Sequence, residues 1–130
     1  MEHAGPYVIR ADEGEAGPLT SGMDRRTLME RPDAWVGVVR TEAGVAGGWH
    51  HHADHDSYIF VLEGALTIDF GPGGRESVVA GPGDFIFNPA GIVHRERTSA
   101  DGPGRVFVVR VGGGPHIVNV EGPEAEAPPG

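Results

Sequence analysis

The chain has 130 residues, the size of one ordinary domain, and contains no cysteine. Without cysteine there are no disulfides, iron–sulfur clusters or thiolate zinc sites, so any metal must be bound through nitrogen and oxygen atoms. Acidic residues outnumber basic ones by 19 to 10, which gives a net charge of −9 with neutral histidines. A surface of this charge repels phosphate backbones and anionic lipids, which argues against nucleic-acid and membrane partners.

The N-terminal part of the sequence is the least regular. Residues 1–6 lack the basic and apolar regions of a signal peptide, and no apolar run in the chain approaches the roughly 18 residues of a spanning helix, so we expect a cytoplasmic protein. Residues 1–31 are expected to form a segment that packs on the main domain. Within it, 7–10 suits an edge strand, 11–22 a loop, and 26–31 either a strand or one helical turn before Pro32.

Short apolar stretches follow one another through the rest of the chain. They are four to seven residues long, rich in Val, Ile, Phe and Tyr, and separated by turns that draw on 22 glycines and 11 prolines. This pattern predicts an all-β sandwich or barrel over 32–120, followed by a flexible tail over 121–130. The expected strands are 35–41, 47–52, 58–63, 65–70, 76–80, 84–88, 93–98, 105–111 and 117–120.

Alternation along these strands predicts which side chains share a face. In 105–111, Phe107 and the valines at 109 and 111 share one face, and Arg110 lies on the other. Phe85 and Phe87 belong to a strand that is expected to line the core.

Four of the seven histidines fall within six residues, from His50 to His55. On a strand, His50 and His52 project to one face and His51 to the other. Two imidazoles at this spacing suit two neighbouring positions around a metal ion. A solvated surface loop is the alternative, although this run leads directly into the most apolar strand. His94 follows a tight turn and, taken alone, is more typical of an ordinary core or surface histidine.

Considered together, the two segments resemble the paired motifs of the cupin superfamily. The first motif is a glycine, two histidines at i, i+2, a glutamate and a second glycine. The second motif is Gly, Pro, Gly, His and Asn at fixed spacings. The resemblance covers 44–98 closely and 35–111 in pattern, with 18 residues between the motifs. The matching positions are Gly44, His50, His52 and Gly64 in the first motif, and Gly83, Pro89, Gly91 and His94 in the second.

The resemblance implies a jelly-roll barrel, the double-stranded β-helix, with a core of six to eight strands. It implies that His50, His52 and His94 point into the barrel mouth and bind one divalent transition metal, which could be Fe, Mn, Ni, Zn or Cu. We expect the two histidine segments to come from opposite sheets. Glycines at the turns 64, 83 and 91 would let the backbone double back.

Two positions depart from the cupin pattern. The glutamate position falls on Asp56 or Ser57, depending on the spacing, and the final asparagine is Thr98. Three outcomes therefore remain open: a three-histidine site with open positions, a four-ligand site completed by Asp56 or His55, or a polar pocket without metal.

Two functions follow from the resemblance. One is a mononuclear, dioxygenase-like enzyme that acts on a small organic molecule. The other is a non-catalytic small-molecule binding or sensor protein with a structural metal or none. No general acid, base or anchoring arginine is assigned inside the barrel, because Arg95 and Arg97 alternate away from His94. By analogy with other small barrels, we expect a homodimer formed through a sheet.

Overall fold

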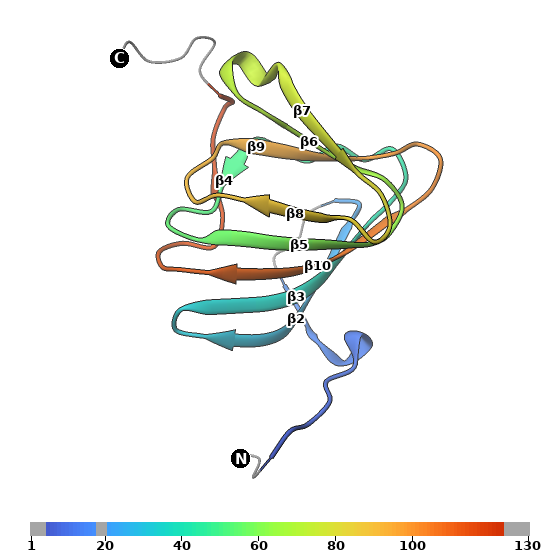
Figure 1. The fold of residues 1–130 in the computed structure, drawn as a ribbon, viewed down its shortest axis with the longest axis vertical. Helices are drawn as coiled ribbons and strands as arrows, with labels where there is room; N and C mark the ends of the chain where they lie inside the picture. The colour runs from blue at the N-terminus through green and yellow to red at the C-terminus, as the bar shows by residue number, and fades with distance from the viewer. Residues whose placement is uncertain (1–4, 18–20, 124–130) are drawn as a thin grey trace.

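Two antiparallel β-sheets enclose the interior of the computed structural model, which describes residues 5–17 and 21–123 (Figure 1). This arrangement confirms the predicted all-β jelly-roll barrel. One sheet has the strand order β1-β2-β3-β10-β5-β8 and the other β11-β4-β9-β6-β7. The strands are β1 (Glu15–Ala16), β2 (Met23–Arg31), β3 (Ala34–Thr41), β4 (His50–His51), β5 (Asp56–Glu63), β6 (Leu66–Phe70), β7 (Glu76–Ala80), β8 (Phe85–Asn88), β9 (His94–Thr98), β10 (Gly104–Val111) and β11 (Val118–Asn119).

The N-terminal segment contributes to the larger sheet. Residues 26–31 are a strand and not a helical turn, because β2 pairs with β3 from Met23↔Thr41 to Arg31↔Ala34. Residues 7–10 form no strand, and the short 3-10 helix η1 (Ala11–Glu13) follows them. A second such helix, η2 (Pro72–Gly74), connects β6 to β7. No helix among the described residues is long and apolar enough to span a bilayer. Most of the expected tail, residues 124–130, lies outside the described residues.

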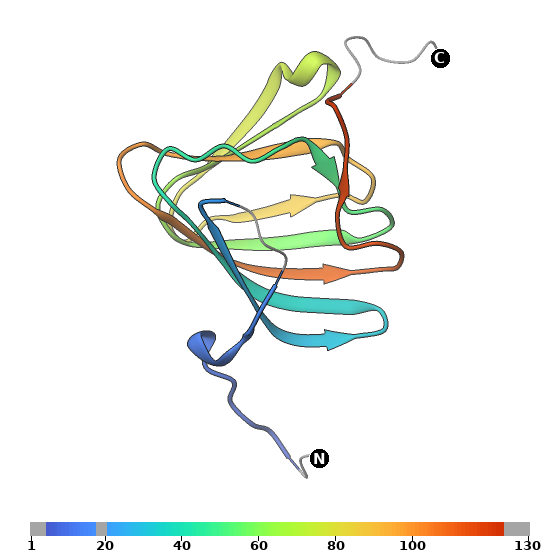
Figure 2. The same ribbon diagram turned by 180° about the vertical axis from the view of Figure 1, so that it is seen from behind.

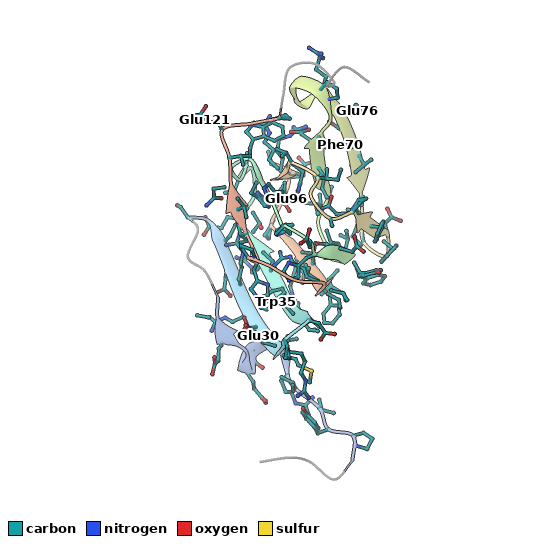
Figure 3. All side chains as sticks on the ribbon, turned by 90° about the vertical axis from the view of Figure 1, so that its left-hand side faces the viewer. Glu30, Trp35, Phe70, Glu76, Glu96 and Glu121 are labelled. Atoms are coloured by element: carbon teal, nitrogen blue, oxygen red, sulfur yellow. The ribbon has the colours of Figure 1, made fainter. Side chains whose placement is uncertain are left out.

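The apolar core lies between the sheets. It consists of Trp35, Ile59, Leu66, Ile68 and Val108. Burial of each such large side chain contributes about 1.5–3 kcal/mol to folding. The indole Nε1 of Trp35 donates a hydrogen bond to a threonine hydroxyl of β2 at 3.1 Å, so its polar atom is satisfied inside the barrel. Trp35 and Glu96 both lie in the middle of the molecule (Figure 3).

Two strands present a different face to the interior from the one their apolar residues suggest. On β10 the buried residues are Val108 and Arg110, so the face that carries Arg110 points inward and Phe107 lies on the opposite face. On β8 the core contact is Ile86, whereas Phe85 and Phe87 are exposed. The strand lines the core through Ile86, as expected, and Phe85 and Phe87 point outward.

The turn at Gly64 requires glycine. Its φ is +75°, a left-handed conformation that side chains rarely adopt, and a Cβ there would collide with the carbonyl of Pro103. Gly83 and Gly91 also have positive φ, at +89° and +76°. All three turns adopt the backbone conformation that the motif glycines predict.

Candidate metal centre

His50 and His94 are direct cross-strand neighbours. β4 pairs with β9 at His50↔His94, and the two ring centroids lie 4.4 Å apart. His52 follows β4, and its ring centroid lies 4.9 Å from that of His50 and 5.1 Å from that of His94. The structure thus brings the three expected histidines together. β4 and β9 are neighbours in the five-stranded sheet, so the expectation of opposite sheets is wrong.

Glu96 is the fourth member of the cluster. It follows His94 by two residues on β9, so it projects from the same face. Its Oε1 lies 3.1 Å from His94 Nε2 and its Oε2 lies 3.5 Å from His50 Nε2. One candidate ligand atom from each of the four residues lies within 4.8 Å of those of the others. The sequence expectation does not include Glu96, although the alternation that turns Arg95 and Arg97 outward places it inward.

Asp56 and His55 lie outside this cluster. Asp56 Oδ1 accepts a hydrogen bond from the backbone N–H of Ala90 at 2.9 Å, which ties β5 to the turn before His94. His55 is buried, with Nδ1 2.9 Å from the carbonyl oxygen of His52 and its ring stacked on His116 at 5.0 Å. Both residues have other partners, and the carboxylate that joins the histidines comes from the second motif segment and not from the first.

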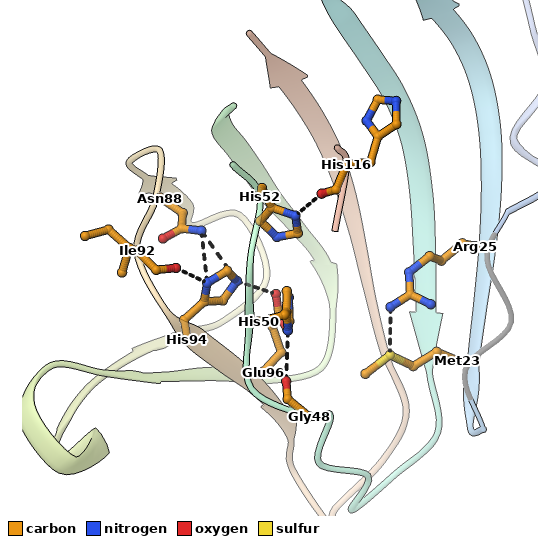
Figure 4. Close-up of polar contacts among 10 residues, drawn as sticks. All are labelled: Met23, Arg25, Gly48, His50, His52, Asn88, Ile92, His94, Glu96 and His116. Atoms are coloured by element: carbon orange, nitrogen blue, oxygen red, sulfur yellow. Dashed lines mark hydrogen bonds and ion pairs between the residues drawn. The ribbon is translucent and has the colours of Figure 1, made fainter. Parts of the chain in front are cut away.

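Backbone carbonyls orient all three imidazoles (Figure 4). The Nδ1 atoms of His50, His52 and His94 lie 2.8, 2.6 and 2.8 Å from the carbonyl oxygens of Gly48, His116 and Ile92. An Nδ1–H that donates to a carbonyl leaves the Nε2 lone pair free, which is the usual arrangement around a metal-binding histidine. The donor set of three imidazole nitrogens and one carboxylate fits a divalent first-row transition metal.

Burial and neighbouring charges set the protonation of the cluster. Burial lowers the pKa of His50, and burial together with the charge of Arg110 lowers the pKa of His52 to about 3. Burial opposes ionisation of Glu96, yet its hydrogen bond with His94 holds the pKa of the carboxyl below its usual range. Burial also disfavours protonated His94, but the same carboxylate raises the pKa of that imidazole. His50 and His52 are therefore neutral donors at physiological pH, and Glu96 is anionic.

Three members of the cluster, His50, His52 and Glu96, form part of the wall of a cavity of about 50 Å³ inside the barrel. This volume is several times what one water molecule needs, so the cavity has room for one small organic molecule. Ile59, Leu66 and Val108 provide apolar wall, and Arg25 and Arg110 bring positive charge. Arg110 is the buried arginine that the sequence expectation leaves out.

The sequence profile of the cupin domain matches residues 37–110, more than half of the chain. The chain belongs to the cupin family. Its cluster of three histidines and one glutamate is able to bind a metal.

Three known proteins are similar to this cupin. An uncharacterized protein of Bacillus subtilis, YdbB, is 46% identical over 50 residues, which is 38% of this chain and 42% of that protein's length. A crystal structure from Klebsiella pneumoniae, of an uncharacterized protein with a double-stranded β-helix domain, has a TM-score of 0.72 and 21% identity over 90% of this chain and 99% of that one. The polyketide cyclase RemF from Streptomyces resistomycificus has a TM-score of 0.73 and 21% identity over 88% of this chain and 85% of its own. At these identities the two structures establish the fold alone.

Proposed function

We propose that this cupin is a metal-dependent, dioxygenase-like enzyme that acts on a small organic molecule bound inside the barrel. The observation that carries the proposal is the orientation of His50, His52 and His94, each held by a carbonyl at Nδ1. The Nε2 atoms of His50 and His94 face the Glu96 carboxylate, where a metal ion would take the place of a shared proton. Glu96 supplies one anionic oxygen beside them. Such a buried donor set is costly for a fold to maintain unless it binds something.

The four residues would occupy four positions of a metal that takes six, which leaves two for substrate and solvent. A bound first-row metal would supply a Lewis acid and, as Fe(II), a redox-active centre for reaction with dioxygen. The protein's own contribution is geometric and electrostatic. The β4–β9 pairing fixes the separation of the imidazoles, and the apolar wall at Ile59, Leu66 and Val108 limits water around the substrate.

One observation favours the alternative, a non-catalytic binding or sensor protein with a structural metal or none. Apart from His50, His52 and Glu96, the ionisable side chains described along the cavity wall are Arg25, Arg110 and Glu63. Glu63 is 56% exposed and pairs with Arg105, so it is poorly placed as a general base. A reaction in this cavity therefore has to use a substrate that needs no separate protein base.

Metal binding is tested with protein that carries no histidine tag. Calorimetric titration with Mn²⁺, Co²⁺, Ni²⁺ and anaerobic Fe²⁺ should give one site per chain. His94→Ala should abolish metal binding. His51→Ala should retain it, because His51 lies outside the cluster and its Nδ1 accepts a hydrogen bond from the backbone N–H of Ala53. Equal metal binding by the wild type and His94→Ala would refute the assignment.

The enzyme and the binding protein are separated by turnover. The Fe(II)-loaded protein is placed in an oxygen electrode with a panel of enols, thiols and catechols, and each compound is also tested for thermal stabilisation. Oxygen uptake that exceeds that of His94→Ala supports the enzyme. Stabilisation without uptake for every compound that binds supports the binding protein.

A further inference from the structure

Arg110 is a buried cation that forms no ion pair with any described residue. Its residue is only 8% exposed, and its guanidinium carbon lies 4.8 Å from the centroid of the Trp35 ring. The Nε atom is buried and has no hydrogen-bond partner. None of the ion pairs found among the described residues includes Arg110. A guanidinium carries five N–H donors and keeps its charge, so burial of this group without an anion is unfavourable.

The position of Arg110 links it to the metal centre. It lines the same cavity as His50, His52 and Glu96, its charge lowers the pKa of His52, and the charges of Glu96 and Arg25 act on Arg110. Arg25 reaches the cavity from β2, on the side away from His94, and Figure 4 shows it across the barrel from the cluster. Two guanidinium groups on one small cavity repel each other, and an anion between or beside them would relieve that repulsion.

Glu96 meets this need only through space: its charge favours the Arg110 cation, but the two groups are not paired. Its two oxygens lie against His94 and His50, at 3.1 and 3.5 Å, and the carboxylate forms no ion pair with Arg110 among the described residues. The apolar contact with Trp35 covers one face of the guanidinium, where a cation–π interaction offsets part of the desolvation. A guanidinium that lies over an aromatic ring and is unpaired at Nε is preorganised to bind a carboxylate through its N–H donors.

We propose that Arg110 is the anchor for a carboxylate group on the small molecule that occupies the barrel. The ligand is thus a small organic acid, held at its carboxylate by Arg110 while the rest of the molecule faces the cluster of three histidines and Glu96. The second half of this statement rests on the proposed function. The anion site itself requires only Arg110 and the cavity.

The test uses metal-free, untagged, full-length protein and two matched probes. Propionate carries the carboxylate, and propionamide has nearly the same shape without charge. The Nε–H resonance of Arg110, assigned by its loss in Arg110→Lys and Arg110→Gln, should shift with propionate and not with propionamide. Arg110→Gln should weaken propionate binding at least tenfold. Arg110→Lys should bind propionate with intermediate affinity, because lysine keeps the positive charge but lacks the paired N–H donors of a guanidinium. Arg105→Gln, on the same strand but in an exposed pair with Glu63, should bind as the wild type does.

Three outcomes would overturn the anchor: no response of the wild type to propionate, equal responses to both probes, or unchanged binding by Arg110→Gln. If Arg110→Gln does not fold, the wild-type resonance and Arg110→Lys decide the question. A parallel Mn²⁺ titration separates the two proposals. Propionate binding without Mn²⁺ binding would support the Arg110 anchor and refute the metal centre. Mn²⁺ binding without propionate binding would support the metal centre and refute the anchor.

Discussion

Polar and charged side chains lie inside the barrel next to its apolar core, whereas aromatic side chains are exposed on the outer face of β5 and β8. The interior holds three histidines, a glutamate and Arg110, whereas the outer face carries four exposed aromatic rings. Their exposed fractions run from 40% to 59%, and the Tyr58 ring lies 5.3 Å from Phe87 and 6.3 Å from Phe85. The two faces thus differ in kind: polar and charged side chains gather around the cavity, and aromatic side chains gather on the outer surface. The four rings are Tyr58, Phe60, Phe85 and Phe87.

We propose that a second copy of this chain covers the aromatic face. β8 is the edge strand of its sheet, and its four residues carry no charge. Edge strands that face water usually carry charged residues that prevent pairing with another chain. With a net charge of −9, two copies repel over most of their surface, and the aromatic face, with its uncharged edge strand β8, is a place where they can meet.

Removal of the outer rings should give the largest effect. Phe85→Ser combined with Phe87→Ser should raise the dimer dissociation constant about 1,000-fold, because buried interface rings each contribute roughly 2 kcal/mol or more. Light scattering after size-exclusion chromatography over a range of concentrations measures this change. Val8→Ser removes an apolar group that is 74% exposed elsewhere and should leave the dimer intact. If the wild type is a monomer at all concentrations, the proposal that a second copy covers the aromatic face is wrong.

Inside the barrel, replacement of Glu96 tests whether its carboxylate binds the metal directly or only lies close to it. Glu96→Gln should weaken Mn²⁺ binding about 100-fold, because loss of a direct ligand costs at least as much as loss of a group that supports one. Asp56→Asn, in the position that the cupin pattern assigns to the carboxylate, should change the affinity less than about twofold. If calorimetry shows a larger loss of Mn²⁺ affinity in Asp56→Asn than in Glu96→Gln, the metal-binding carboxylate is Asp56 of the first motif.

The outer face of the five-stranded sheet, which carries charges, is stabilised differently from the aromatic face. Asp69 is buried and accepts hydrogen bonds from Arg95 at 2.9 Å, from Arg97 at 2.6 and 2.8 Å, and from Ser77 at 2.7 Å. Asp69→Asn should lower the free energy of unfolding by about 2–3 kcal/mol in urea denaturation. Asp24→Asn breaks only an exposed pair with Arg26 and should cost less than about 0.5 kcal/mol.

The free energy of unfolding should depend on pH, because His52 stays neutral inside the folded barrel and becomes protonated in the unfolded chain. The pKa of His52 is about 3 in the folded protein against an ordinary 6.5, so below pH 6.5 the unfolded chain binds a proton that the folded one does not. The stability of the metal-free protein should therefore fall as pH drops from 6.5 to 4.5, with a contribution from this residue that approaches about 1.4 kcal/mol per pH unit near pH 5. His52→Gln should flatten that slope in thermal unfolding. An equal slope in wild type and variant would assign the loss to other groups.

Much of this structure could be predicted from the sequence, and the failures share a cause. Apolar stretches and glycine turns located most strands, and motif spacing brought His50, His52 and His94 together. Alternation states which residues share a face but not which face is inside. For that reason Glu96 and Arg110 were missed, and the outward direction of Phe85 was not predicted. The β4–β9 pairing that joins the histidines is a long-range register, and no local pattern encodes it.

The carbonyl of His116 orients His52 from 64 positions further along the chain, and β11 runs beside β4 to bring it there (Figure 2). The ligand geometry thus depends on residues close to the end of the described chain. During synthesis on the ribosome, the site reaches its final form only after nearly the whole barrel has emerged. Metal uptake is then expected to follow the last stages of folding and not to nucleate them.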